Sequence, residues 1–88
     1  MKLLHCLECG DVLALLSQPR SCRCGRSQGR YLEDGHAAEY SGPACVVYLS
    51  NSGVERAIRA LRARPGLAPQ KVACAVAFAT ERTRRIDA

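Results

Sequence analysis

Residues 6–25 read CLECGDVLALLSQPRSCRCG and contain two short cysteine pairs, C-x2-C and C-x-C, each followed by a glycine. The candidate metal ligands are Cys6, Cys9, Cys22 and Cys24. Each pair bends the backbone into a knuckle that aims two sulfurs at one point, and Gly10 and Gly25 tolerate the positive φ of such a bend. Because four thiolates at the corners of a tetrahedron suit zinc in closed structural sites, we expect one structural Zn2+ here.

Other chemistry could also use these four sulfurs. A tetrahedral S4 site accepts a rubredoxin-type iron, and two disulfides or four buried thiols are further alternatives. A disulfide within the C-x-C pair would close a strained ring. His5 could replace one sulfur, but four thiols are already available, so we expect it to be a strand residue beside the site. The segment between the pairs, residues 11–21, is expected to form a hairpin that turns at residues 18–21.

The knuckles carry a resemblance. Cys6-Leu7-Glu8-Cys9-Gly10 and Cys22-Arg23-Cys24-Gly25 resemble the knuckles of zinc-ribbon or rubredoxin-knuckle proteins. Residues 22–52 look more closely like small uncharacterised zinc-ribbon proteins of bacterial and phage genomes, and the resemblance as a whole covers roughly residues 6–52. The C-x-C form departs from the commonest ribbon pattern, and Leu7 stands where many ribbons carry proline. The resemblance implies a structural metal site but no particular activity.

The composition predicts a thin core. The chain has 88 residues, enough for one domain, and its large core formers are few: one Phe, no Trp, three Tyr and one Met. Such a core leaves little margin of stability, so a metal staple is expected. We expect a single domain over residues 1–88, with a zinc-ribbon part at 1–29 and a sheet with one helix at 30–88. The predicted fold class is α+β, a small zinc ribbon joined to an antiparallel or mixed β-sheet packed by one helix.

Turn signals divide the middle of the chain. Asp34-Gly35 favours a tight hairpin between the strands on either side of it. A second turn at residues 41–43 leads into an apolar strand at residues 44–49, which we expect to be central and covered on both faces. Together these strands predict a small meander.

The second half predicts a helix and a further strand. Ser52 and Glu55 have the form of a capping box, which predicts a helix at about residues 52–64. Residues 71–80 alternate large and small apolar side chains, which indicates a strand. Strand, helix and strand are then expected to form a crossover unit whose helix lies on one face of the sheet.

Two cysteines lie outside the candidate site, and several common catalytic motifs are absent from the sequence. Cys45 and Cys74 lie in apolar runs and are expected to be buried core thiols, with a redox pair or second metal site as the alternative. Four ligands leave no open metal position, and the sequence has no phosphate loop, nucleophile elbow or H-E-x-x-H motif. We therefore expect that the protein is not an enzyme.

The start of the sequence carries no membrane signal. Its longest apolar stretch, residues 12–16, is far too short for a bilayer span or a signal-peptide core. We expect a cytoplasmic protein with no membrane contact, and in a reducing compartment cysteines serve metals before disulfides.

The charge balance leads to the first functional hypothesis. Thirteen Lys and Arg against eight Asp and Glu give a net charge of +5. The candidate contacts to nucleic acid or to a partner are Arg20, Arg23, Arg26, Arg56, Arg59 and Arg62. The planar fork of arginine suits phosphate, so one hypothesis is a zinc ribbon that binds nucleic acid by arginine–phosphate contacts. Few aromatic residues are present, which disfavours a stacking platform for single strands.

The hypothesis that we favour is a different one. A small stapled domain can act as a non-enzymatic, zinc-stabilised protein-interaction module with a protein partner. The resemblance to phage proteins points to an adaptor or inhibitor of phage or mobile-element origin that acts on host nucleic-acid machinery. Self-association is left open, because the apolar strand at residues 72–79 can be completed by a symmetric partner.

Overall fold

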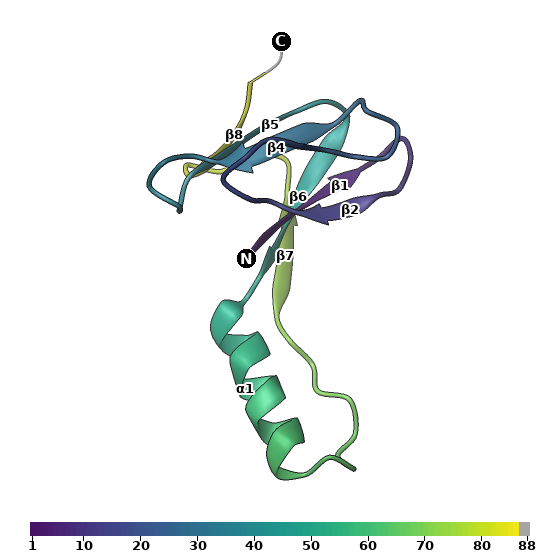
Figure 1. Ribbon diagram of the computed structural model, residues 1–88, viewed down its shortest axis with the longest axis vertical. Coiled ribbons are helices and arrows are strands. Elements are labelled where there is room, and N and C mark those ends of the chain that lie inside the picture. The colour runs from purple at the N-terminus through teal and green to yellow at the C-terminus, as the bar shows by residue number, and fades with distance from the viewer. Residues whose placement is uncertain (87–88) are drawn as a thin grey trace.

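Two four-stranded β-sheets and one helix form the part of the chain that the computed structural model describes, residues 1–86 (Figure 1). Sheet A has the antiparallel order β2-β1-β6-β7, in which β1 is Lys2–Cys6, β2 is Val12–Ala14, β6 is Ala44–Leu49 and β7 is Cys74–Ala77. Sheet B has the order β3-β4-β5-β8, in which β3 is Arg20–Ser21, β4 is Gln28–Tyr31, β5 is Ala38–Ser41 and β8 is Thr83–Arg85. Within residues 1–86, β5 and β8 are the only strands that pair in parallel. The predicted α+β class is confirmed.

One core is shared by the two sheets. Side chains alternate between the two faces of a strand, so Leu4 and Cys6 of β1 are buried in this core while the other three residues of β1 are half-buried. The same holds for Ala38 and Tyr40 of β5. The core cluster consists of Leu4, Cys6, Leu13, Leu15, Cys22, Ala38, Tyr40, Ala44 and Val46. Two of the candidate metal ligands are therefore part of the core.

The turn signals in the middle of the chain led to correct strands. The Asp34-Gly35 hairpin forms, with Tyr31 of β4 opposite Ala38 of β5. The Asp34 carboxylate accepts hydrogen bonds from the backbone N–H groups of His36 and Ala37, each at 2.9 Å, and these bonds lower its pKa. The strand expected at residues 44–49 is β6, with the same bounds. It is central, although only its first half is buried.

The expected pairing of several strands is wrong. The segment at residues 11–21 is not a hairpin, because β2 pairs with β1 in sheet A and β3 pairs with β4 in sheet B. The expected meander is also wrong, because β5 belongs to sheet B whereas β6 belongs to sheet A. The described chain thus crosses between the sheets three times, between β2 and β3, at residues 41–43, and between β7 and β8.

The helix α1, Asn51–Ala63, is confirmed, but its cap and its position differ from the prediction. Its N-cap is Ser50, whose hydroxyl accepts a hydrogen bond from the Gly53 N–H at 3.0 Å, so a capping box on Ser52 is wrong. None of the residues of α1 is buried. Figure 1 shows α1 projecting away from both sheets. The chain accordingly measures 48 × 29 × 21 Å, with a radius of gyration of 14.7 Å against about 12 Å for a compact domain of this length.

The second strand of the expected crossover is confirmed as β7, but the crossover itself is wrong. β7 lies beside β6 and antiparallel to it, with Leu49 opposite Cys74. An antiparallel neighbour needs no connection across the face of the sheet, so nothing draws the helix over that face. We call α1 and the returning residues 64–73 the arm. Among residues 1–86, no helix is long and apolar enough to cross a membrane.

Candidate metal centre

The two sheets each supply one cysteine pair to the site. Cys6 is the last residue of β1 in sheet A, and Cys9 lies in the turn that follows. Cys22 directly follows β3 in sheet B, and Cys24 lies in the next turn. The structure therefore brings together two pairs that belong to different sheets.

Both turns have the knuckle form that the sequence predicts. The Gly10 N–H donates to the Cys6 carbonyl at 2.9 Å, and the Gly25 N–H donates to the Cys22 carbonyl at 3.0 Å. The φ values of the two glycines are +75° and +77°, in the left-handed region that a side chain disfavours. Each glycine lets the chain turn back just after its second cysteine.

The four sulfurs are close enough to share one ion. All four Sγ atoms lie within 4.8 Å of one another. The Cys6–Cys24 and Cys22–Cys24 sulfur pairs are 3.8 and 3.4 Å apart. A tetrahedron with metal–sulfur bonds of about 2.3 Å has edges of about 3.8 Å. Since all four cysteines are free thiols and none is in a disulfide, the cluster can hold a metal ion.

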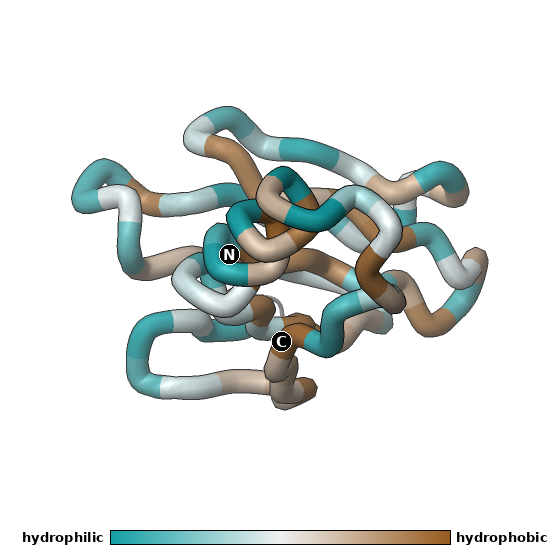
Figure 2. The backbone as a smooth tube through the Cα atoms, turned by 90° about the horizontal axis from the view of Figure 1, so that it is seen from below, coloured by the Kyte–Doolittle hydropathy of each residue, from teal (hydrophilic) through white to brown (hydrophobic). Residues whose placement is uncertain are grey.

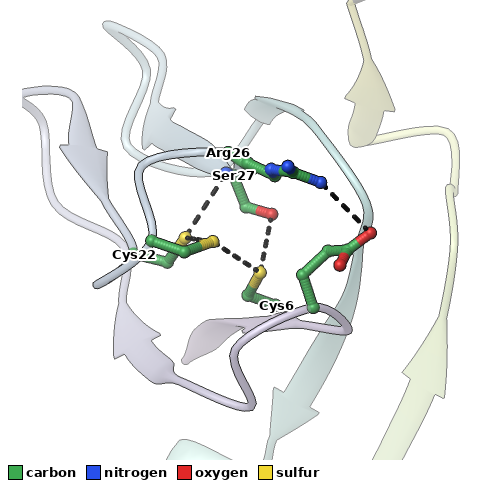
Figure 3. A network of polar contacts seen from close by, with 6 residues as sticks. Cys6, Cys22, Arg26 and Ser27 are labelled. Carbon is green, nitrogen blue, oxygen red and sulfur yellow. Dashed lines mark hydrogen bonds and ion pairs between the residues drawn. The ribbon is translucent and has the colours of Figure 1, made fainter.

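Ser27 supports the cluster from inside the core. It is fully buried, its hydroxyl donates to the Cys6 Sγ at 3.2 Å, and its backbone N–H donates to the Cys22 Sγ at 3.4 Å (Figure 3). One residue therefore contacts a sulfur from each sheet. Sequence reasoning missed Ser27, because a serine three residues after a knuckle cysteine is an ordinary loop residue until the fold is known.

These contacts separate the pKa values of the thiols. Burial raises the pKa of Cys22, but the backbone N–H of Ser27 and the neighbouring thiols outweigh burial and lower it to about 6. The hydroxyl of Ser27 is the main cause of the lowered pKa of Cys6. The Arg26 N–H lowers the pKa of Cys24, yet the Cys22 thiol and burial raise it to about 12. Cys22 thus supplies a thiolate at neutral pH, which is the form of sulfur that binds metal.

Gly42, in the turn between β5 and β6, lies against the second knuckle. Its φ is +96°, and a Cβ at this position would lie 2.0 Å from the Arg26 carbonyl oxygen. Only a glycine therefore lets this turn pack on the loop that holds Cys22 and Cys24. The sequence offered the turn itself as a signal, but not the close approach to residues far along the chain.

Polar contacts tie the two knuckles together at the surface. The Asp11 carboxylate accepts a hydrogen bond from the Arg23 backbone N–H at 2.9 Å. Arg26 and Glu8 form an exposed ion pair at 3.6 Å, visible in Figure 3. An exposed pair of this kind contributes little to stability. Cys24 is exposed and Cys9 half-buried, so one edge of the cluster faces solvent while Cys6 and Cys22 face the core.

The candidate arginines fall into two groups. Arg20, Arg23 and Arg26 are exposed around the second knuckle, and the guanidinium of Arg20 donates to the Ala14 carbonyl at 2.7 Å. The other group, Arg56, Arg59 and Arg62, is exposed on α1. Figure 1 shows the arm at one end of the long axis and the loops of the cysteine pairs toward the other. The six arginines therefore form no continuous surface.

The remaining two cysteines differ from each other. Cys45 of β6 is buried, in line with a core thiol. Cys74 of β7 is exposed, so the prediction of a core thiol is wrong there, because α1 does not cover the edge of sheet A. Neither residue joins the cluster of four sulfurs.

The chain matches no protein-family model, no curated protein and no solved structure. The class that the fold and the site define is an α+β protein of two sheets and one helix, with a cluster of four cysteines that could bind a metal ion.

Proposed function

We propose that this protein is a non-enzymatic, zinc-stabilised protein-interaction module that binds its partner through the arm. The observation that carries the proposal is α1, a helix of 13 residues with none of them buried. An isolated helix of this length is marginal in water, so most helices depend on an apolar face that packs against another surface. A partner supplies that surface here.

The side chains of α1 define the chemistry of the partner. Val54, Ile58 and Leu61 lie on one side of the helix, and Ile58 is 46 % exposed. Arg59 and Arg62 flank this stripe. The matching surface is an apolar groove with an acidic rim, of the kind that binds an amphipathic helix through residues spaced three and four apart. The protein then acts as an adaptor or an inhibitor of the molecule that carries the groove.

Zinc is the metal that we propose for the centre. Four thiolates with a tetrahedral spacing suit zinc in closed sites, and a closed site has no position for a substrate. The ion then has a structural role, and the arm makes the contacts with the partner.

A second candidate function is nucleic-acid binding through the second knuckle. It is favoured by Arg20, Arg23 and Arg26, which are all exposed beside the cluster. It uses only half of the candidate arginines, since the other three lie on the arm. We therefore rank it below protein binding.

A pull-down from nuclease-treated lysate separates the two functions. We expect the wild type to capture a protein partner whose binding survives nuclease treatment. Ile58→Asp should abolish this binding, whereas Leu16→Asp should retain it. Leu16 is a matched control because it is 53 % exposed and lies outside the arm. Loss of every partner on nuclease treatment, with binding to generic duplex that weakens steeply between about 50 and 200 mM salt, contradicts the proposal and favours nucleic acid. Equal loss with both variants contradicts the role of α1.

A further inference from the structure

An unprotected edge of sheet A lies at β7. Residues 72–80 read VACAVAFAT, with no charged residue and no proline. Val76 and Phe78 are 64 % and 66 % exposed, and β6 is the only strand that pairs with β7 in the described chain. Figure 2 shows hydrophobic segments, in brown, at the periphery of the backbone tube. Natural edges of this kind are usually blunted by charges or proline, or else they pair with another strand.

The backbone of β7 is poised for such pairing. The Ser50 N–H donates to the Ala73 carbonyl at 3.2 Å, which makes this an H-bonded pair of the ladder between β6 and β7. Since H-bonded and non-H-bonded pairs alternate along an antiparallel ladder, Ala75 and Ala77 bond to β6. The N–H and carbonyl of Val76 therefore point to the open edge.

The sequence of this edge is complementary to itself. If two copies of β7 pair antiparallel about a two-fold axis at Val76, then Ala75 opposes Ala77 of the second copy. Large side chains then share one face and alanines share the other.

We propose that β7 is a homodimer interface, where two copies of this chain pair edge to edge into one continuous sheet. The two Val76 residues exchange their backbone hydrogen bonds at the axis. The observed register places Val47 beside Val76 and Leu49 beside Cys74. An apolar row then runs across the junction, from Val47 through Val76 to Val76 and Val47 of the second copy, and such cross-strand pairs stabilise sheets.

Charge favours a second copy as the occupant of this edge. The chain carries +5 overall, yet the paired segment brings no charge to the centre of the interface. The nearest charged residues along the segment, Lys71 and Glu81, both lie outside β7. This contact is isologous, so it closes at two copies. It uses neither the apolar stripe of α1 nor the metal centre, and it is therefore independent of the function proposed above.

Sedimentation of the full metal-loaded chain tests the interface. We expect the wild type to sediment near twice the chain mass of 9.5 kDa and Val76→Lys to sediment as a monomer. The substitution faces solvent in the single copy, whereas in the dimer it sets two like charges directly opposite each other. Val12→Lys is the matched control, because Val12 is 51 % exposed on the other edge strand of sheet A, and this variant should stay dimeric.

A thiol cross-link tests the register. In a Cys74→Ser background, Val76→Cys should be joined to its copy by a short bifunctional thiol reagent, whereas Val12→Cys should not. A wild type that stays at 9.5 kDa at every concentration overturns the proposal. So does a dimer that Val76→Lys leaves intact, or cross-linking that is equal for the two cysteine variants. None of these outcomes bears on whether Ile58→Asp loses a partner.

Discussion

Ser27 links the two cysteine pairs through its own polar atoms. Its hydroxyl and its backbone N–H contact the sulfurs of Cys6 and Cys22, at 3.2 and 3.4 Å. Groups that hydrogen-bond to metal ligands fix their orientation and raise metal affinity. Because the residue is fully buried, no water can replace its hydroxyl without a change in packing.

Replacing Ser27 with alanine should therefore weaken metal binding by about 10- to 100-fold, since one sulfur loses its donor. Competition with a chelator of known affinity measures the change. Ser17→Ala, at an exposed position away from the sulfurs, should leave the affinity as it is. Equal affinities for Ser27→Ala and the wild type contradict the supporting role of this hydroxyl.

Gly42 is a second residue that the metal centre requires, for steric reasons. Gly42→Ala carries the cost of a left-handed residue, about 1 to 2 kcal/mol, and also forces apart the turn and the Arg26 carbonyl. Gly35→Ala is the control, because Gly35 has a φ of +72° with open space around it. In denaturant unfolding, Gly42→Ala should lose clearly more free energy of unfolding and should also bind metal more weakly. Equal losses for the two variants argue against the packing role.

At the scale of elements, α1 depends on its own cap more than most helices do. Its residues are not buried, so tertiary packing adds little to its stability in the free chain. Ser50→Ala should then reduce the stability of α1 by about 1 kcal/mol and leave the sheets unchanged. Amide hydrogen exchange measures this as faster exchange in α1 with unchanged exchange in β6. Ser52→Ala, at the position that a capping box would use, should speed exchange in α1 less than Ser50→Ala does. A larger effect at Ser52 would show that Ser52 is the N-cap.

Signals from neighbouring residues in the sequence were enough to predict the longer elements. The Asp34-Gly35 hairpin, the strand β6 and the strand β7 follow from turn residues and alternation within a few positions, and the helix was located to within one residue although its predicted capping box is wrong. The partners of the short strands do not follow from local signals. β2 and β3 have three and two residues, so their pairing is decided by distant strands and not by the segment between them.

The same limit applies to the candidate site. The spacing of the cysteines predicted which four sulfurs come together, because each pair is set by its own turn. Ser27 and Gly42 reach the site only through the crossings of the chain between the sheets. The position of α1 was also beyond local signals, since it follows from β7 lying beside β6.

At the scale of the whole molecule, a metal ion held by the four cysteines would cross-link the two sheets. Cys6 and Cys9 follow β1 in sheet A, and Cys22 and Cys24 follow β3 in sheet B. The core that otherwise joins the sheets is thin, and Cys6 and Cys22 are members of it. A zinc ion in a small module contributes about 10 to 16 kcal/mol. A whole domain is stable by only about 5 to 15 kcal/mol, so we predict that this chain folds only with the ion bound.

Purified protein should therefore carry about one zinc per chain, and removing the metal with a chelator should unfold it. Cys22→Ser should have the same effect, because it removes a ligand whose lowered pKa makes it a thiolate at neutral pH. Cys74→Ser is the control, since this thiol is exposed and lies outside the cluster, and it should keep both zinc and fold. Metal analysis, far-UV circular dichroism and the melting temperature follow the change.

A metal-free chain with the spectrum and melting temperature of the metal-loaded chain contradicts the cross-link. Iron in place of zinc is compatible with the cross-link but contradicts the proposed identity of the ion. Because the arm packs on neither sheet, some helical signal from α1 can outlast the loss of the sheets, and the strand signal is the one that must disappear.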